Sequence, residues 1–197
     1  MSEKIKCGID LDDVLFSTTN SIFVRLKEQF PDKDVQECLV TRWDVAECLG
    51  LPEDIVRKTI YDTIKASYFS AKLGSLQTLN YYKDTFEYYF ITARNATLTE
   101  HTHLNLQIVL EDLYKKENIY LVDEKHKIIK ALGLSVFIDD RAKTIENIYK
   151  HTDCLPVVYS KPWNQRLKQK FRRVTDWSDI FQTLHYIKEE SSEWRVF

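Results

Sequence analysis

The 197-residue sequence lacks several features that would point to a particular class of protein. Its four cysteines form no C-x-x-C pair, which argues against a zinc knuckle or a disulfide scaffold and favours reduced thiols. No apolar run approaches the roughly 20 residues of a membrane span, and the N-terminal apolar segment is too short for a signal peptide. The 28 basic and 30 acidic residues nearly cancel, so no strong overall charge attracts nucleic acid or anionic membrane. We therefore expect a cytoplasmic protein without membrane contact.

The composition is that of an ordinary globular protein, with 44% apolar and 29% charged residues. A chain of this length suits one compact core that carries an insertion. We therefore expect a single folded unit.

Short apolar runs rich in β-branched and aromatic residues alternate with longer stretches of helical periodicity. We expect strands in "KIKCGID" near the start and at 86–92, 119–123, 136–140 and 155–159, and helices at 104–116, 125–133 and 142–150, with a last one starting near Trp177. This alternation predicts an α/β fold that is Rossmann-like, with a mostly parallel sheet and helices on both faces.

One interval breaks the alternation. Roughly 70 residues separate the first two strands, whereas an ordinary βαβ unit needs about 30. The interval shows helical periodicity at 21–30 and 53–69. We predict a small helical cap over 15–79, inserted into an α/β core of 1–14 and 80–190 and followed by a C-terminal tail of 191–197.

Two acidic clusters follow strands that are far apart in the sequence. Asp10, Asp12 and Asp13 follow the first strand, and Asp139 and Asp140 end the fourth. The carboxyl ends of parallel strands meet at one edge of a sheet. Two like charges about 4 Å apart repel by about 4 kcal/mol at an effective dielectric constant of about 20. A divalent cation removes this conflict, and an all-oxygen site suits Mg²⁺. Taken alone, the first cluster is equally explained as turn or helix-capping residues, a role that suits Asp13.

Four segments in order, "DLDDVL", "FITAR", a lysine that opens a helix, and "FIDDR", resemble the motifs of the haloacid dehalogenase superfamily. The segments "SYFSAKLGSLQTL", "VVYSKPWNQ" and "RRVTDWSDI" are similar to its 5'(3')-deoxyribonucleotidase branch. The resemblance extends from about residue 5 to 185. It implies a magnesium-dependent phosphomonoesterase that hydrolyses nucleoside monophosphates, with deoxyribonucleotides preferred, through an aspartyl-phosphate intermediate.

The resemblance also implies roles for the acidic residues. Asp10 matches the nucleophile, and Asp12 matches the residue that protonates the leaving oxygen and then activates water. Residues at i and i+2 of an extended chain share one face, so both carboxylates can face one phosphate. The implied Mg²⁺ ligands are the Asp10 side chain, the Asp12 backbone carbonyl and an acid of the fourth motif. We assign Asp139 to that last position, with Asp140 as its competitor.

The phosphate-binding residues follow from the same resemblance. Thr92 matches a hydroxyl that hydrogen-bonds a phosphate oxygen, with backbone N–H groups from Ala93 onward in support. Without the motif, Thr92 would be explained as a helix N-cap. Lys125 matches the lysine that holds phosphate oxygens and neutralises charge. Lys127 competes with it, and an exposed lysine is the alternative for either.

The cap would close over the leaving group and select the substrate. Base stacking on aromatic rings is available to any nucleobase. Most aromatic residues of this region are expected in the core. As substrate-binding residues we predict Phe16, Tyr68 and Phe69, with Arg94 of the second motif; Phe23 and Trp43 are further candidates.

Other functions remain open. A phosphatase acting on nucleic-acid 3' ends is a second enzymatic option, because 161–173 is locally basic with aromatic residues. A signalling receiver domain is disfavoured by the order of the motifs and by the insertion. A catalytically silent binding protein on the same scaffold is the non-enzymatic alternative. The expected partner is a small phosphate ester; nucleic acid is possible but less favoured, and the sequence is compatible with a homodimer.

Overall fold

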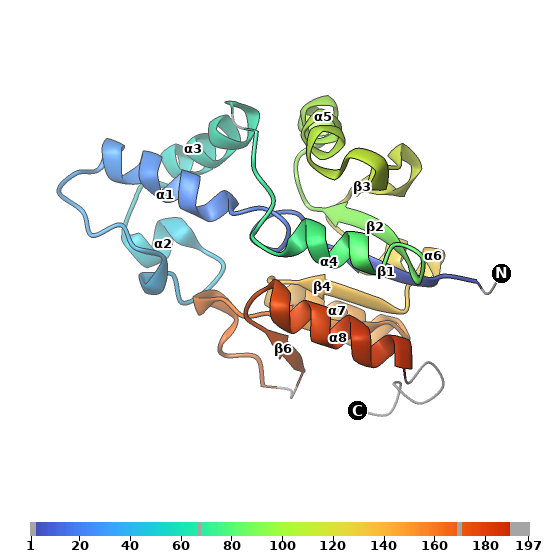
Figure 1. Ribbon diagram of the computed structural model, residues 1–197. Helices are drawn as coiled ribbons and strands as arrows, with labels where there is room; N and C mark the ends of the chain where they lie inside the picture. Colours follow the sequence, from blue (N-terminus) through green and yellow to red (C-terminus); the bar gives the residue numbers. More distant parts are fainter. Residues whose placement is uncertain (1–2, 67, 169–170, 190–197) are drawn as a thin grey trace.

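The computed structural model describes residues 3–66, 68–168 and 171–189. Its described strands form one six-stranded sheet in the order β3-β2-β1-β4-β5-β6, and every pairing is parallel (Figure 1). The strands are β1 (Ile5–Ile9), β2 (Phe86–Thr92), β3 (Ile119–Leu121), β4 (Val136–Asp139), β5 (Leu155–Tyr159) and β6 (Arg172–Val174). All five predicted strands are confirmed, and β6 at the edge is an addition.

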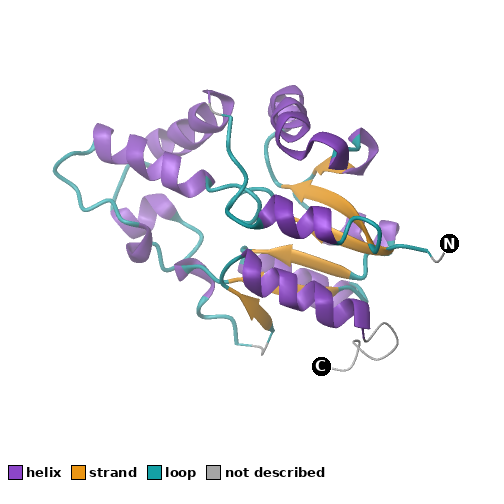
Figure 2. Cartoon of the chain, viewed as in Figure 1, coloured by secondary structure: helices purple, strands orange, loops and turns teal. Residues whose placement is uncertain are grey.

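Helices cover both faces of the sheet (Figure 2). On one face, α4 (Ser75–Tyr81), α5 (Thr99–Leu110) and α8 (Trp177–Glu189) contribute Leu79, Leu106 and Ile180 to the main hydrophobic cluster. On the other face, α6 (Lys125–Leu132) and α7 (Ala142–His151) contribute Ile129 and Ile148 to a second cluster. The predicted α/β architecture is therefore confirmed.

The long interval after β1 is helical and lies beyond the carboxyl ends of the strands (Figure 1). It contains α1 (Thr18–Gln29), the short 3₁₀ helix η1 (Glu37–Leu39), α2 (Val45–Leu49) and α3 (Glu53–Ala66). We call these four the inserted helices. They pack around a hydrophobic cluster of their own that includes Ile22, Leu26 and Val56. The short 3₁₀ helices elsewhere are Ala96–Leu98, Glu111–Leu113, Lys116–Asn118 and Pro162–Asn164.

The predicted end of the insertion at residue 79 differs from the structure. Residue 79 lies inside α4, and α4 packs against α8 on the sheet rather than on the inserted helices. The side chain of Leu79 is fully buried in the main cluster, which explains why this helix stays with the sheet. The predicted tail of 191–197 lies outside the described residues.

Two connections join the inserted helices to the sheet domain, and they run side by side. Phe16 of the first connection forms an antiparallel bridge with Ala71 of the second. Lys72 N donates a hydrogen bond to Leu15 O at 2.8 Å. The backbone of Phe69 is bonded at both its N–H and its carbonyl by the side-chain amide of Asn105, on α5.

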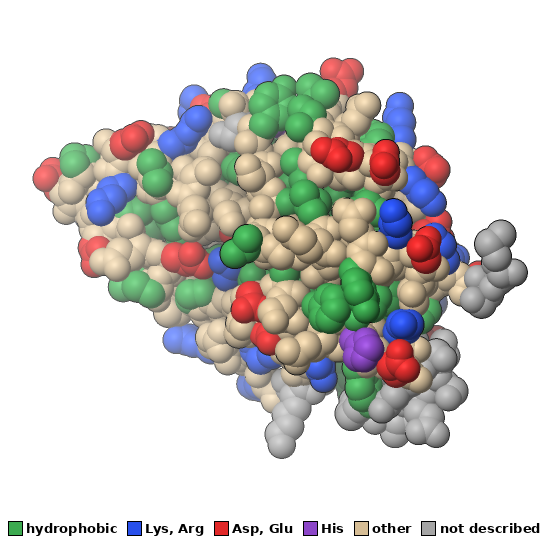
Figure 3. Space-filling view, in the orientation of Figure 1, with side chains coloured by type: hydrophobic (Ala, Val, Ile, Leu, Met, Phe, Trp, Pro, Cys, Tyr) green, Lys and Arg blue, Asp and Glu red, His purple; other side chains and the backbone are tan. Residues whose placement is uncertain are grey.

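Acidic and basic side chains are interspersed on the face of the molecule seen in Figure 3, which therefore shows no large patch of a single charge sign. No helix within the described ranges is both long and apolar enough to cross a lipid bilayer.

Candidate active site

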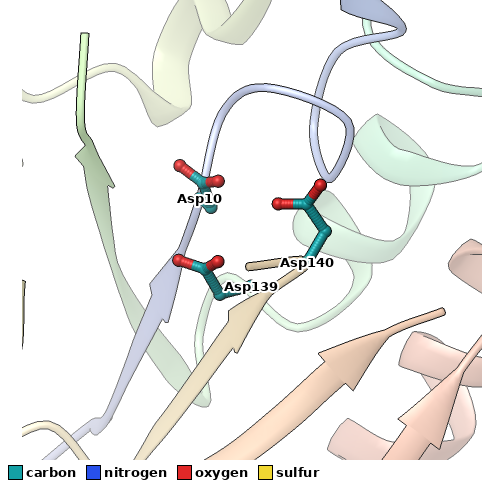
Figure 4. A group of neighbouring side chains, drawn as sticks. All are labelled: Asp10, Asp139 and Asp140. Atoms are coloured by element: carbon teal, nitrogen blue, oxygen red, sulfur yellow. The ribbon is translucent and has the colours of Figure 1, made fainter. Parts of the chain in front are cut away.

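The two acidic clusters meet at the carboxyl edge of the sheet, as the sequence predicted. The strands β1 and β4 are neighbours, and Asp10 N donates a hydrogen bond to Ile138 O. Asp10 directly follows β1. Asp139 is the last residue of β4, and Asp140 directly follows that strand (Figure 4). One carboxylate oxygen from each of the three lies within 4.8 Å of the other two, and all three residues are buried.

Lys125, the first residue of α6, lies beside this cluster. Its Nζ is 2.7 Å from Asp10 Oδ1 and 2.7 Å from Asp139 Oδ2, and its side chain is only 3% exposed. Burial acts to lower the pKa of Lys125, but the charges of the two carboxylates outweigh it and raise that pKa above its usual value. Lys127 is exposed and pairs with Glu124 instead. Only the first of the two candidate lysines therefore reaches the acidic cluster.

One ammonium group does not neutralise three buried carboxyl groups. Burial raises the pKa of Asp10 to about 7, although the charge of Lys125 opposes this rise. Burial, followed by the charges of Asp139 and Asp10, also raises the pKa of Asp140 well above its usual range. The cluster therefore favours either protonated carboxyl groups or a bound cation at neutral pH.

The hydrogen bonds of the two neighbouring aspartates differ in one respect that bears on cation binding. Both oxygens of Asp139 accept hydrogen bonds, Oδ2 from Lys125 Nζ and Oδ1 from Arg141 N at 2.7 Å. Asp140 Oδ2 accepts one from Trp163 Nε1 at 3.0 Å. Asp140 Oδ1 is the only buried side-chain nitrogen or oxygen in the described ranges that has no hydrogen-bond partner. A native fold rarely leaves such an atom unsatisfied unless an ion or water binds it. The geometry thus favours Asp140 over Asp139 as a cation ligand, the reverse of the order expected from sequence.

The side chain of Asp12 is not one of the three clustered carboxylates and instead binds Arg94. Arg94 NH2 donates to Asp12 Oδ1 at 2.7 Å and Arg94 Nε donates to Oδ2 at 2.9 Å. The hydroxyl of Thr18, on α1, adds a third bond to Oδ1 at 2.6 Å. Burial acts to raise the pKa of Asp12, but the guanidinium charge and these hydrogen bonds hold that pKa below its usual value. Arg94, predicted to bind substrate, is here the partner of the predicted general acid.

Thr92 ends β2 at the same edge of the sheet and is buried. Its hydroxyl accepts a hydrogen bond from Arg94 N at 3.3 Å. The alternative explanation of Thr92 as a helix N-cap does not hold, because Asn95 caps the following 3₁₀ helix through a bond from Thr97 N. Thr92 and Ala93 line the same cavity as Asp10 and Lys125.

This cavity of about 690 Å³ lies between the strand ends and the inserted helices. Its wall toward the sheet carries the charged and hydroxyl side chains described above. Its wall toward the inserted helices is mostly apolar and comprises Ile22, Phe23, Val40, Trp43, Val45, Ala46, Val56, Ile60, Tyr61 and Ile64, with Asp44, Glu53 and Arg57 among them. The cavity thus has a polar end and an apolar end.

The three aromatic residues predicted to contact the base do not line this cavity. Phe16 and Phe69 are buried against each other, and the guanidinium of Arg94 lies over both rings, at 5.7 and 5.6 Å from their centres. Tyr68 is 57% exposed and contacts the ring of His101. The Phe16 and Phe69 rings thus lie against Arg94 and the Tyr68 ring lies at the surface, an arrangement that sequence periodicity does not reveal.

The two further candidates, Phe23 and Trp43, do line the cavity, and side chains that were not expected there join them. Trp43, Trp163 and Arg141 line the cavity together. The guanidinium of Arg141 lies 5.5 Å from the centre of the Trp43 ring, and the two tryptophan rings meet edge to face at 5.7 Å. Arg141 directly follows the acidic pair, and Trp163 follows β5 at the same edge of the sheet. Ligands of parallel sheets bind at the carboxyl ends of the strands, so this rule alone would have made both residues candidates for the site.

Three described basic residues of the stretch at 161–173 make internal contacts: Lys161, Arg172 and Arg173. Lys161 pairs with Glu37 of η1 at 2.7 Å. Arg172 Nε donates to Thr183 Oγ1, and Arg173 donates to the side chain and the backbone of Asn164. These contacts favour a structural role for these three residues over nucleic-acid binding.

A family model for "5' nucleotidase, deoxy (Pyrimidine), cytosolic type C protein" matches residues 3–189. The chain belongs to this nucleotidase family. The predicted family is thereby confirmed, and the protein is a phosphoric monoester hydrolase.

Similar proteins agree with this assignment. A protein of Oceanobacillus iheyensis described as "Putative nucleotidase OB0422" is 26% identical over 188 residues, which cover 90% of this chain and 98% of the relative. Among solved structures, the haloacid dehalogenase-like protein ATU0790 from Agrobacterium tumefaciens, described as of unknown function, has a TM-score of 0.67 at 13% identity, covering 94% of this chain and 99% of that one. The "putative HAD-hydrolase YfnB from Bacillus subtilis bound to magnesium" has a TM-score of 0.60 at 9% identity, covering 93% and 100%. At these identities the two structures show a common fold.

Proposed function

We propose that this nucleotidase hydrolyses nucleoside monophosphates, deoxyribonucleotides above all, with the help of Mg²⁺. One observation carries the proposal: a buried lysine and three buried aspartates converge at the polar end of a cavity whose other end is apolar. A phosphate fits the first end, and a sugar with its base fits the second. The family description, which names a deoxy-pyrimidine 5' nucleotidase, supports this substrate class.

The donor set fits a magnesium ion. Asp10 and Asp140 supply carboxylate oxygens, and the backbone carbonyl of Asp12 completes the set of protein ligands that we propose. All are hard oxygen ligands, and Mg²⁺ keeps several waters, so few protein ligands suffice. When bound, the ion neutralises the carboxylates and polarises a phosphate oxygen. Asp139, bonded at both oxygens, instead positions Lys125. The magnesium-bound structure of YfnB supports the choice of metal.

The chain's own residues then perform two displacements. Asp10 attacks phosphorus, and the bond from phosphorus to the leaving oxygen breaks as the aspartyl-phosphate forms. Asp12 starts as a carboxylate paired with Arg94; in this proposal it takes up a proton as the phosphate dianion binds, gives that proton to the leaving oxygen, and afterwards takes one from the water that attacks phosphorus and releases Asp10. Thr92, the backbone N–H of Ala93 and the ammonium of Lys125 hold the phosphate oxygens and stabilise their developing charge.

The inserted helices act as the cap in this proposal. The apolar wall that they provide excludes water and accepts the base, and the exposed ring of Trp43 offers a stacking surface at the cavity. The family's description as cytosolic supports the cytoplasm as the place of action, with a free nucleotide as the partner.

Phosphate release from a substrate panel tests the proposal. The panel contains 5' and 3' monophosphates of ribo- and deoxyribonucleosides, sugar phosphates, and oligonucleotides with a 3' phosphate, each with Mg²⁺ and with chelator. We expect turnover of deoxyribonucleotides that chelator abolishes and that Asp10→Asn removes. Turnover that chelator does not affect would overturn the metal part, and a preference for oligonucleotides or sugar phosphates would overturn the substrate class.

A further inference from the structure

Trp163 connects the inserted helices to the acidic cluster. It belongs to the short 3₁₀ helix after β5 (Pro162–Asn164), in the sheet domain. Its ring is nevertheless part of the hydrophobic cluster of the inserted helices, together with Leu26 and Val40. The Nε1–H of the same ring donates a hydrogen bond to Asp140 Oδ2 at 3.0 Å. One side chain therefore contacts both the interior of the insertion and a carboxylate of the active site.

The hydrogen bond from Trp163 is the one that orients the carboxylate of Asp140. Asn164 Nδ2 donates to the backbone carbonyl of Asp140 at 2.7 Å and to that of Tyr159 at 2.8 Å, and Arg173 in turn fixes Asn164. The backbone is thereby fixed, whereas the carboxylate has a single hydrogen bond, from Trp163. That bond engages Oδ2 and leaves the buried Oδ1 without a partner in the cluster with Asp10.

The geometry points to Trp163 as a positioning residue that couples docking of the inserted helices to cation binding at Asp140. The inference rests on the proposed Mg²⁺ site. While the ring stays in the cluster of the inserted helices, its N–H directs Asp140 Oδ1 toward the cation position. A displacement of those helices removes the packing that holds the ring and with it the direction of the N–H. Coupling between two events is reciprocal, so cation binding in turn stabilises the docked arrangement of the inserted helices.

The variant Trp163→Phe separates the hydrogen bond from the packing, because phenylalanine keeps an aromatic ring and lacks the N–H. Trp177→Phe is a matched control: Trp177 is also buried, and its Nε1 donates to Val14 O at the same 3.0 Å. Loss of a group that orients a metal ligand typically weakens metal affinity about 10–100-fold. By calorimetry with Mg²⁺ on the full chain, we expect at least about a 10-fold weaker affinity for Trp163→Phe and the wild-type affinity for Trp177→Phe. Wild-type affinity in Trp163→Phe would overturn the positioning role.

Hydrogen exchange tests the coupling first in the wild-type chain, where the result does not depend on how well a variant folds, and then in the variant. We expect saturating Mg²⁺ to slow amide exchange in α1 and α3, and to do so less in Trp163→Phe saturated with Mg²⁺. Equal exchange with and without Mg²⁺ in the wild type, or equal protection in the variant, would overturn the coupling.

These measurements also separate the inference from the proposed function. If the wild type binds Mg²⁺ but releases no phosphate from nucleotides, the substrate proposal fails while the coupling stands. If the wild type binds no Mg²⁺, both the metal site and the inference fail.

Discussion

The ammonium group of Lys125 lies at the same 2.7 Å distance from Asp10 and from Asp139. Asp10 follows β1, and Asp139 ends the neighbouring strand β4, so the lysine joins the two halves of the acidic cluster at the centre of the sheet. This arrangement, together with the neighbouring ion pair of Asp12 and Arg94, leads to four testable predictions.

Lys125→Met should strongly destabilise the metal-free protein at neutral pH. Removing one member of a buried ion pair leaves the partner uncompensated and costs about 3–5 kcal/mol. Urea unfolding of the wild type and the variant in chelator measures the difference. Lys127→Met is the control two residues away, where the lysine is exposed and paired with Glu124, and it should change the unfolding midpoint little. Similar effects of the two substitutions would contradict the assigned role of Lys125.

Asp140→Asn should weaken Mg²⁺ binding more than Asp139→Asn does. The free oxygen belongs to Asp140, whereas both oxygens of Asp139 accept hydrogen bonds from the protein. Calorimetric titration with Mg²⁺ gives the two dissociation constants. A larger loss of Mg²⁺ affinity in Asp139→Asn than in Asp140→Asn would instead identify Asp139 as the ligand, as first expected from the sequence.

Arg94→Met should lower the free energy of unfolding by about 3 kcal/mol at neutral pH, because the Asp12 carboxylate loses its charged partner in a mostly buried position. The pKa of Asp12 is lowered in the folded state, so the stabilisation is present above the unfolded value of about 3.9 and is lost as pH falls below it. The difference between wild type and variant should therefore shrink in acid. Arg57→Met, at an exposed pair with Glu53, serves as the control. A difference that stays constant down to low pH would contradict the assignment.

The stabilisation by Mg²⁺ should increase with pH. In the metal-free protein, burial raises the pKa of Asp10 to about 7, against about 3.9 in the unfolded chain. The folded state then binds more protons than the unfolded state between these values, so metal-free stability falls as pH rises from about 4 to 7. Ionised carboxylates bind Mg²⁺, and protons compete with the metal. Thermal unfolding at several pH values should show a Mg²⁺-induced shift in Tm that grows up to and beyond pH 7. A shift independent of pH, or one that persists fully in Asp10→Asn, would contradict this.

The fold was largely predictable from sequence because most residues of β1 to β5 are apolar and buried. The exception is β6, whose three residues include Arg172 and Arg173 and lie at the edge of the sheet, where burial leaves little pattern in the sequence. The expected end of the insertion at residue 79 falls inside α4, and only the contacts of this helix with α8 assign it to the sheet.

The polar end of the site followed from one rule, the meeting of parallel strand ends at one edge. That rule brings Asp10, Thr92, Lys125 and Asp140 together. It does not say which of two adjacent aspartates keeps a free oxygen, since this depends on donors such as Trp163 and Arg141 N. Nor does it orient aromatic rings in the connections, so it does not show that Phe16 and Phe69 lie outside the cavity lining.

The paired connections between the two parts of the molecule restrict how the cavity can open. Because Phe16 bridges Ala71 and Lys72 bonds Leu15, the entry and exit of the insertion form a single two-stranded joint. Any movement of its four helices would therefore pass through that joint, and the packing of α1 against α3 favours their moving together.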